Sequence, residues 1–392
     1  MTKQPSYRFG GYTEAWAEKK LGEVNDVRDG THDSPKYVQD GYPLVTSKNL
    51  TSEGLDFSDI SFISEVDYIS INKRSKVEIG DIIFGMIGTI GNPVLLKKDG
   101  FAIKNVALLK KDGFIDNSFL IQLLQSSSFI KYISLENAGG TQKFLGLSQI
   151  RNFQLFSPSL PEQTAIGSFF QDIDQLISLQ QRKLEVLKEQ KKTYLKLLFP
   201  AKGQTKPALR FAGFEDEWKE VKLGEVATIT MGQSPNSENY TDNPNDYILV
   251  QGNADMKNGR VFPRVWTTQI TKQAKQGNLI LSVRAPVGDI GKTDYDVVLG
   301  RGVASIDGNE FLYQVLSQMK QNGYWSKLST GSTFESINSN DIKSAIISLP
   351  SLPEQEVIGS FFQDLDKAIA KQEEKVNQLK ESKQTLLRKM FI

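Results

Sequence analysis

The stretch Pro158-Ser-Leu-Pro-Glu-Gln163 recurs 192 residues later as Pro350-Ser-Leu-Pro-Glu-Gln355. Both copies continue alike, as Ile166-Gly-Ser-Phe-Phe-Gln-Asp172 and as Ile358-Gly-Ser-Phe-Phe-Gln-Asp364. From Pro158 to Phe199, about 24 of 42 positions are identical in the second copy. The period is close to half of the 392-residue chain, which is too long for a solenoid repeat. The repeat therefore indicates a duplicated domain, each copy followed by a helix.

A second repeat opens each half of the chain. Residues 8–24 (RFGGYTEAWAEKKLGEV) match residues 210–226 (RFAGFEDEWKEVKLGEV) at about 10 of 17 positions. The segments between the repeats are only weakly alike, as in Gly80-Asp-Ile-Ile-Phe84 and Gly277-Asn-Leu-Ile-Leu281. Two interpretations are open. The halves are either a duplication whose copies have diverged by sequence drift, or two modules that share one framework and recognise different ligands. The predicted divisions are a domain at 1–157, a helix at 158–204, a domain at 205–349 and a helix at 350–392.

Each Leu-Pro-Glu-Gln motif is followed by a helical pattern. Pro161 and Pro353 suit the first turn of a helix, and the glutamate after each suits the positive end of the helix dipole. The apolar spacing then alternates between four and three residues, which predicts a coiled-coil seam. The seam positions are Ile173, Ile177, Gln180, Leu184, Leu187, Lys191, Tyr194 and Leu198, then Leu365, Ile369, Gln372, Val376, Leu379, Lys383, Leu386 and Met390.

Two polar positions of the seam predict its orientation. A parallel pair would stack Lys191 on Lys383, whereas an antiparallel pair sets Gln180 opposite Lys383 and Lys191 opposite Gln372. We therefore predict an intramolecular antiparallel coiled coil, with helices that pack on partner proteins as the alternative. At 1.5 Å per residue the seam spans about 38 Å, close to one turn of B-DNA.

Composition favours a binding protein over an enzyme. The chain has no cysteine and one histidine, which excludes disulfides, thiolate nucleophiles and multi-histidine metal sites. Gly291-Lys-Thr293 imitates the end of a phosphate-binding loop, but Pro286 stands where that loop needs glycine. No stretch reaches the roughly 18 apolar residues of a membrane span, and the start lacks a signal peptide, so we expect a cytoplasmic protein. The net charge of +1 does not itself indicate a nucleic-acid partner.

The duplicated openings and helices resemble those of type I restriction-modification specificity subunits. The resemblance covers essentially the whole chain. The segment between the repeats in each half also resembles a target-recognition domain. In the first half Asp29-Gly-Thr-His-Asp-Ser-Pro35 carries this likeness. In the second half it is carried by Gly232-Gln-Ser-Pro235, Ser282-Val-Arg-Ala-Pro-Val-Gly288 and Gly300-Arg-Gly302. One departure is that the helical repeat has a single proline next to its glutamate, where many members have two nearby.

The resemblance implies a fold and a set of partners. The fold is α+β, with two duplicated mixed α/β target-recognition domains separated by two long helices. The function is recognition of a bipartite double-stranded DNA target, one half-site per domain, by a chain that is not itself catalytic. The partners would be two modification (methyltransferase) subunits, which use S-adenosylmethionine, and restriction subunits, which use ATP and Mg. This chain would bind no cofactor, metal or membrane. The alternative function is a coiled-coil adaptor whose duplicated domains bind proteins.

Base reading needs hydrogen-bonding side chains on loops, with Arg or Lys for guanine and Asn or Gln for adenine. The candidates in the first domain are Thr31, His32, Lys36, Thr46, Ser47, Lys48, Asn49, Thr141, Gln142 and Lys143. Those in the second domain are Gln233, Ser234, Gln251, Asn253, Lys257, Arg284, Arg301, Thr330, Ser332 and Thr333.

Other roles are open for several of these residues. His32 is either a DNA contact or a structural turn residue, and Arg284 and Arg301 either read bases, bind phosphate or support loops. Tyr240 and Trp266 fit the core better than a stacking platform. The aromatic pairs at the start of each helix pack on their own domain or contribute to the methyltransferase interface; they are Phe169, Phe170, Phe361 and Phe362.

Overall fold

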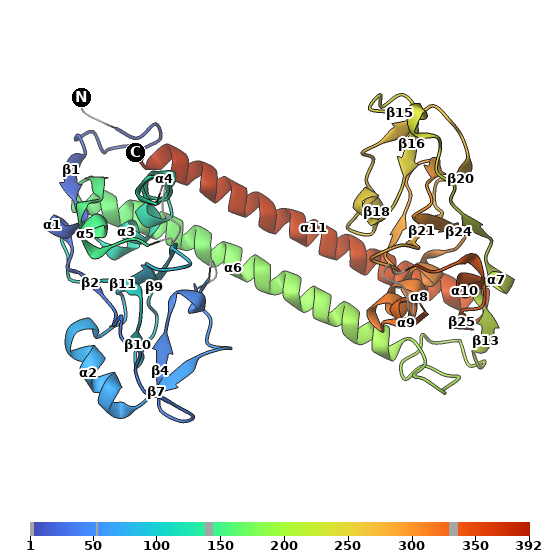
Figure 1. Cartoon of the computed structure of the whole chain (residues 1–392), viewed down its shortest axis with the longest axis horizontal. Coiled ribbons are helices and arrows are strands. Elements are labelled where there is room, and N and C mark those ends of the chain that lie inside the picture. The colour runs from blue at the N-terminus through green and yellow to red at the C-terminus, as the bar shows by residue number, and fades with distance from the viewer. Residues whose placement is uncertain (1–3, 52–53, 138–143, 329–335) are drawn as a thin grey trace. The chain divides into compact units, whose positions relative to one another are not determined.

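The two predicted long helices are present in the computed structural model, as α6 (Leu160–Leu197) and α11 (Leu352–Met390) (Figure 1). Pro161 and Pro353 are the second residue of their helices, as predicted. The structure describes residues 4–51, 54–137, 144–328 and 336–392. Within those residues no helix is both long and apolar enough to cross a membrane.

The chain folds as two units, and each contains parts of both long helices. The first unit comprises Met1–Gln181 and Glu374–Ile392, and the second comprises Arg182–Glu373. Each unit therefore combines the beginning of one long helix with the end of the other. The last residues of the chain belong to the first unit, although nearly two hundred residues of the second unit precede them.

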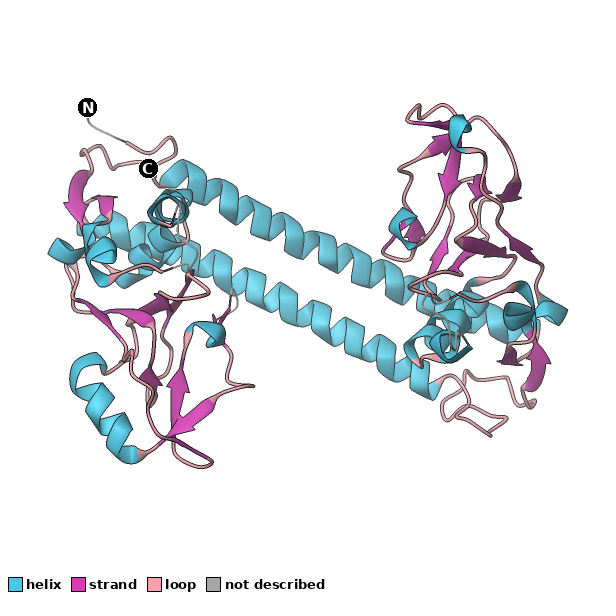
Figure 2. Cartoon of the chain, viewed as in Figure 1, coloured by secondary structure: helices cyan, strands magenta, loops and turns pink. Residues whose placement is uncertain are grey.

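The first unit is a mixed α and β body, and Figure 2 shows its strands in magenta. Its sheets are β1-β12, β10-β4-β7-β3, β2-β11-β8-β9 and β5-β6. The strands are β1 (Ala17–Lys20), β2 (Val27–Asp29), β3 (Tyr37–Val38), β4 (Tyr42–Val45), β5 (Leu50–Thr51), β6 (Gly54–Leu55), β7 (Ser61–Ile63), β8 (Ile82–Gly85), β9 (Gly91–Leu95), β10 (Ala102–Ile103), β11 (Val106–Leu109) and β12 (Gln154–Ser157). The shorter helices are α1 (Leu21–Val24), α2 (Glu65–Ser75), α3 (Asn117–Leu124), α4 (Ser127–Glu136) and α5 (Leu147–Asn152), with a 3-10 turn η1 (Ser47–Asn49).

The second unit is built in the same manner. Its sheets are β13-β25, β14-β24-β21-β22-β18-β17 and β15-β19-β16-β23-β20. The strands are β13 (Lys219–Lys222), β14 (Ile229–Met231), β15 (Tyr240–Thr241), β16 (Tyr247–Val250), β17 (Met256–Lys257), β18 (Arg260–Val261), β19 (Trp266–Thr267), β20 (Lys272–Ala274), β21 (Leu279–Ser282), β22 (Ile290–Lys292), β23 (Val297–Leu299), β24 (Val303–Ile306) and β25 (Ile346–Leu349). The helices are α7 (Leu223–Val226), α8 (Glu310–Gln321), α9 (Tyr324–Leu328) and α10 (Ser339–Lys343), with 3-10 turns η2 (Ser237–Asn239) and η3 (Asn253–Asp255).

The central strands of each unit are apolar runs that are buried on both faces. Strands β8 and β11 in the first unit, and β21 and β24 in the second, are buried along their whole length. Helix α3 begins where Asp116 accepts a hydrogen bond from the Ser118 amide, and α8 begins where Asn309 accepts one from Leu312. Strand composition thus accounts for the buried centre of each unit, and the caps account for where α3 and α8 begin.

Within each unit the two long helices run antiparallel. In the first unit Lys383 pairs with Asp174 at 2.6 Å, and in the second Lys191 pairs with Asp366 at 2.6 Å. All the predicted seam positions are buried or half-buried. The seam faces inward within each unit, so the interpretation that it faces a partner protein is wrong. The ion pairs of both seam lysines are with aspartates that the sequence analysis did not consider.

The end of each long helix completes the core of one unit. Phe391 packs on Phe119 and Phe170 in the first unit, with ring centroids 5.2 and 6.0 Å apart. Phe199 packs on the matching pair in the second unit, Phe311 and Phe362, at 5.3 and 6.0 Å. The sequence repeat therefore reappears as a repeated packing arrangement.

A buried ion pair anchors the start of each long helix. The guanidinium of Arg8 donates two hydrogen bonds, of 2.6 and 2.7 Å, to the carboxylate of Glu162, whose side chain is 1% exposed. Arg210 and Glu354 form the same bidentate pair at 2.7 Å. The sequence predicted that the two glutamates interact favourably with the helix dipole. In the structure each glutamate also forms an ion pair with an arginine.

Candidate functional site

The second unit contains a polar cleft of about 350 Å³ where its two larger sheets meet. Four loops form it: those that follow β14, β16 and β21, and the turn between β23 and β24. The cleft is lined by hydroxyl, amide and guanidinium groups together with backbone. The lining residues are Ser234, Tyr240, Gln251, Gly252, Asn253, Ser282, Arg284, Ala285, Arg301 and Gly302.

Glycines allow the cleft loops to approach one another closely. A Cβ on Gly302 would lie 2.0 Å from the carbonyl oxygen of Gln251, and one on Gly232 would lie 2.1 Å from that of Gly300. Backbone hydrogen bonds hold the same loops, as when the Gly300 amide donates to Val250 at 2.8 Å. The glycines of the Gly-Arg-Gly motif are therefore required by the close packing of the backbone.

A buried carboxylate supports the floor of the cleft. Asp255 is 3% exposed and accepts hydrogen bonds from the Gln251 amide at 2.7 Å and the Gly252 amide at 3.3 Å. Its other oxygen pairs with Arg264 at 3.0 Å. The carboxylate is therefore neutralised and directed at backbone, and it does not offset the positive charge of the cleft.

Two arginine side chains of the cleft are exposed. Among the described residues, the guanidinium groups of Arg284 and Arg301 have no hydrogen-bond or ion-pair partner. Only their main chains are held: the Arg301 amide donates to the Ser234 hydroxyl at 3.0 Å, and the Ser282 hydroxyl donates to the Arg284 carbonyl at 3.0 Å. These two side chains are available to bind an anionic or acceptor-rich ligand.

The first unit has the same loop framework. The Gly30 amide donates to Val106 at 2.8 Å, as the Gly232 amide donates to Val303 at 3.0 Å. The Lys104 amide donates to Val45 at 2.9 Å, in the way that Gly300 donates to Val250. The loops after β2, β4 and β8, and the turn between β10 and β11, therefore correspond to the loops of the cleft in the second unit.

His32 lies in this framework and is held at both ring nitrogens. Its Nδ1 is 2.8 Å from Oδ1 of Asn105 and its Nε2 is 2.9 Å from Oδ2 of Asp29. The hydrogen bond with Asn105, and then that with Asp29, raise the pKa of His32 above its ordinary value. Arg74 pairs with the other oxygen of Asp29 at 2.9 Å. With an oxygen facing each nitrogen, the arrangement favours the doubly protonated ring.

Several predicted DNA contacts of the first unit support its loops. Asn49 is 2% exposed and donates to the carbonyls of Asp56 and Asp59 at 3.2 Å. Thr46 donates to Asn49 at 3.1 Å, and the buried Ser47 donates to the Asn105 carbonyl at 3.1 Å. This geometry favours a supporting role for these three over a direct contact with DNA.

The remaining candidates are distributed as follows. Lys36 is exposed, Thr31 is half-buried, and Lys48 forms a surface pair with Asp59 at 3.0 Å. In the second unit Lys257 is exposed but does not line the cleft, and Gln233 is exposed beside it. The candidates that lie outside the described residues are Thr141, Gln142, Lys143, Thr330, Ser332 and Thr333.

Sequence reasoning overlooked Lys104 and Asn105, which form the turn between β10 and β11. Lys104 donates to the Ser34 hydroxyl at 3.2 Å, and Asn105 contacts His32. The turn corresponds to the Gly-Arg-Gly turn of the second unit, but none of its residues is identical to a residue of that motif. Only an alignment of the two strand patterns could have identified it.

The aromatic candidates divide between cleft and core. Tyr240 is 38% exposed and lines the cleft, so its assignment to the core is wrong, whereas Trp266 is half-buried in β19. Phe170 and Phe362 are 0% exposed within their units, which excludes them from a partner surface in this conformation. Phe169 is half-buried against Phe9, as Phe361 is against Tyr194.

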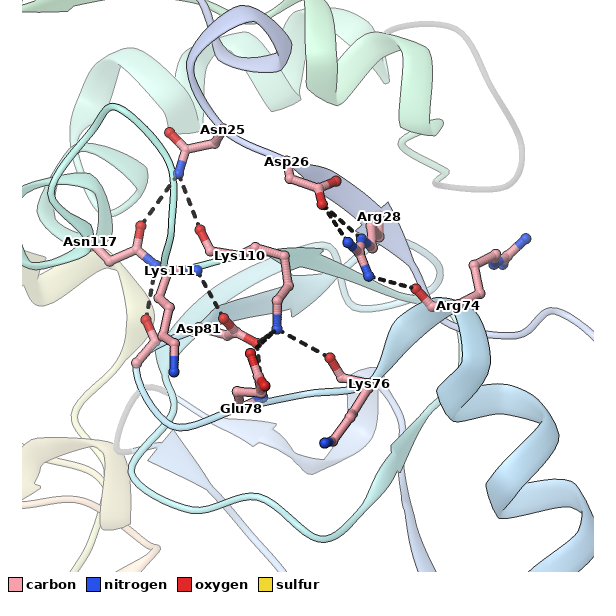
Figure 3. A network of polar contacts seen from close by, with 11 residues as sticks. Asn25, Asp26, Arg28, Arg74, Lys76, Glu78, Asp81, Lys110, Lys111 and Asn117 are labelled. Atoms are coloured by element: carbon pink, nitrogen blue, oxygen red, sulfur yellow. Dashed lines mark hydrogen bonds and ion pairs between the residues drawn. The ribbon is translucent and has the colours of Figure 1, made fainter.

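A network of charged groups in the first unit is structural rather than catalytic (Figure 3). Lys110 donates to Asp81 at 2.6 Å and to Glu78 at 2.9 Å, and Asn117 donates to the Gly80 carbonyl nearby. Burial lowers the pKa of Lys110, but the hydrogen bonds with Asp81 and Glu78 outweigh burial and raise it. In the described part of the chain no cluster of three potential metal ligands occurs.

Comparison with known proteins identifies the family. The model of the type I restriction modification DNA specificity domain matches residues 13–189 and again residues 215–381. The chain belongs to the type I restriction-modification DNA specificity family. Such a specificity subunit selects DNA in a type I restriction-modification system and is not catalytic, and the cofactors of the system are used by its partner subunits.

Individual relatives of this specificity subunit cover it almost completely. The putative type I restriction enzyme MjaX specificity subunit of Methanocaldococcus jannaschii is 27% identical over 406 residues, which cover 97% of this chain and 93% of the relative. The type I restriction-modification S subunit of M. genitalium has the same fold, with a TM-score of 0.66 at 15% identity over 100% of this chain and 99% of that one. A chain from work on complex assembly and conformational transition of a type I system gives a TM-score of 0.57 at 23% identity, with 98% of both chains covered.

Proposed function

We propose that each unit reads one half-site of a bipartite double-stranded DNA target through its four-loop framework. The observation that carries this proposal is the cleft of the second unit, where two arginines without a partner among the described residues lie beside amide and hydroxyl groups. Base edges in the major groove offer donors and acceptors, and such a mixture can distinguish them. The matching framework of the first unit supports a second half-site, and the differing side chains support a different sequence for it.

The proposed contacts follow from exposure. In the second unit they are Gln233, Ser234, Gln251, Asn253, Arg284 and Arg301, and in the first unit Thr31, His32 and Lys36, with Lys104 added. The long helices would fix the gap between the half-sites. The predicted division into recognition domains at 1–157 and 205–349, each followed by a spacer helix, is part of this proposal.

The proposed assembly contains two modification subunits and the restriction subunits around one specificity chain. S-adenosylmethionine would be used by the former, and ATP and Mg by the latter, in the cytoplasm where chromosomal DNA lies. The half-buried faces of Phe169 and Phe361 stay a prediction for the methyltransferase interface.

The test is a methylation map. The chain is co-expressed with the methyltransferase of its own system in a host that lacks adenine methylation, and modified adenines are located genome-wide. The expected result is a two-part motif with a fixed gap and one methylated adenine in each part. A complex that forms but methylates no such motif would contradict bipartite reading and favour a protein-binding adaptor.

A second measurement tests the binding surface directly. DNA affinity of the complex should fall as salt rises, because the contacts displace counterions from phosphates. Arg284→Ala should weaken binding, whereas Lys275→Ala, an exposed surface lysine paired with Asp296, should not. Equal effects of the two substitutions would argue against the cleft as the DNA surface.

A further inference from the structure

The turn between β23 and β24 is one residue longer than its counterpart in the first unit. The Gln233 amide donates to Leu299 as the Thr31 amide donates to Ile103, and the strands after the turn begin at Val303 and Val106. Between these fixed points the first unit has Lys-Asn and the second has Gly-Arg-Gly. The second unit therefore carries an arginine, Arg301, on a longer turn inside a framework that is otherwise shared.

The main chain of this arginine is held on both sides. Its amide donates to Ser234 at 3.0 Å, the Gly300 amide donates to Val250 at 2.8 Å, and the Gly302 carbonyl accepts from Val283 at 2.9 Å. Neither neighbouring glycine has room for a Cβ free of contact with Gln251. The base of the side chain is thus fixed while its guanidinium is exposed and unpaired among the described residues. Such preorganisation suits a directional contact.

The surroundings of Arg301 resemble a base-reading surface more than a phosphate-binding one. A phosphate site needs positive charge, whereas the cleft also presents the side-chain amides of Gln251 and Asn253 and the hydroxyl of Tyr240. Among the described residues that line the cleft there is no carboxylate, because Asp255 is buried against backbone and Arg264. The Arg301 guanidinium, which has no hydrogen-bond partner among the described residues, can donate two parallel hydrogen bonds to a ligand.

We propose that Arg301 determines specificity by donating two hydrogen bonds to O6 and N7 of a guanine in the half-site of the second unit. This inference rests on the proposed function, because it requires the second unit to contact DNA. The arginine fork matches the two acceptors that guanine alone presents side by side in the major groove. The first unit has no arginine at the corresponding turn and reads its half-site without this contact.

The test compares methylation motifs of four complexes: wild type, Arg301→Ala, Arg301→Lys and Arg260→Ala. Arg260 is the matched control, since it is an exposed arginine of the same unit, paired with Asp294 and absent from the cleft lining. We expect both Arg301 variants to relax one G·C position of one half-site by roughly 5- to 150-fold. The other half-site, the gap and the Arg260→Ala motif should be unchanged.

The lysine variant separates base reading from phosphate binding. Lysine keeps the charge but loses the planar fork, so it should restore a phosphate contact in full and the discrimination for guanine only in part. A wild-type motif with Arg301→Ala, or a uniform loss of methylation with an unchanged motif, would overturn the proposal. So would a wild-type motif that contains no G·C pair in either half-site.

A binding measurement covers the case in which a variant abolishes methylation. The purified complex is titrated with the mapped duplex and with duplexes in which each G·C pair is replaced by A·T. Loss of discrimination at one pair in Arg301→Ala, with affinity for unrelated duplex retained, supports the inference, and full discrimination overturns it. If the wild-type complex shows no bipartite motif at all, it is the proposed function that fails.

Discussion

The two units share a framework and differ in what the framework presents. The anchoring pairs Arg8–Glu162 and Arg210–Glu354 have the same geometry, and the amide of Gln122 bonds Asp174 at 3.1 Å as that of Gln314 bonds Asp366 at 3.0 Å. The side chains on the loops differ between the units. In the first unit both ring nitrogens of His32 are hydrogen-bonded, whereas in the second unit the Arg301 guanidinium has no partner among the described residues.

This difference shows where each kind of residue is needed. Side chains that recur in both halves join the long helices to the units, and their partners are buried groups that must be matched. Side chains that differ lie on loops, where the backbone framework holds them and a substitution changes the surface without disturbing the core. Four tests, in decreasing order of expected effect, examine this division.

The largest effect is expected where a helix end enters a core. Phe391→Ala and Phe199→Ala should each lower the free energy of unfolding by about 3–5 kcal/mol, because each leaves a cavity among buried aromatic rings. Hydrogen exchange measured by mass spectrometry should place the loss in the first unit for Phe391 and in the second for Phe199. A loss spread evenly over both units in either variant would show that the division is wrong.

The anchoring ion pairs should reveal a difference between the units. Glu162→Ala should cost about 3 kcal/mol, because it leaves a buried guanidinium unpaired. Glu354→Ala should cost about 1 kcal/mol less, since Arg210 keeps a 2.7 Å bond to the Asp216 carbonyl, whereas Nη1 of Arg8 already lacks a partner. Urea denaturation measures both, and Lys48→Ala at a surface pair is the control, with less than about 0.5 kcal/mol expected. A smaller cost for Glu162 than for Glu354 would contradict this account.

The close packing of the cleft loops gives an intermediate effect. Gly302→Ala places a methyl group against the Gln251 carbonyl and should cost about 1–3 kcal/mol while reducing methylation at the target. Gly10→Ala, which meets nothing within 4 Å, should leave both stability and methylation unchanged. If the two alanines behave alike, the glycine is not needed for loop packing.

The smallest effect concerns pH and the first unit alone. Because the folded pKa of His32 is raised above its unfolded value of about 6.5, its stabilising contribution is complete below that pH. It is lost as pH rises through the folded pKa. The side chain is 45% exposed, so we expect less than about 1 kcal/mol. Unfolding of wild type and His32→Ala should converge at alkaline pH, and a constant difference from pH 6 to 9 would disprove the linkage.

The sequence predicted those parts of the fold that repeat with a fixed spacing. The heptad pattern located both long helices, because burial imposes a period on the sequence. The Arg8–Glu162 pair was missed, since its residues lie 154 positions apart and nothing local connects them. Asp174 was overlooked because it flanks a seam position and only the length of the Lys383 side chain brings the charges together.

The candidate site was predictable where its residues form motifs. Ser234, Gln251, Arg284 and Arg301 were selected from the sequence and line one cleft. Asn49 was selected for its chemistry alone. The same side-chain amide can stabilise a turn or contact a base, and the burial of Asn49 favours the turn. Lys104 was not selected from the sequence because the turn that carries it contains no recognisable sequence motif.

The position of Phe391 has a consequence for the order of folding. Translation delivers every residue of the second unit, 182–373, before the closing segment 374–392 of the first unit. All residues of the second unit are therefore synthesised before the segment 374–392 that the first unit needs, although the first unit begins earlier in the chain. A chain that stops at residue 373 would contain every residue of the second unit, whereas the first unit would lack Leu387, Met390 and Phe391, and the core surface that these residues cover would be exposed and apolar.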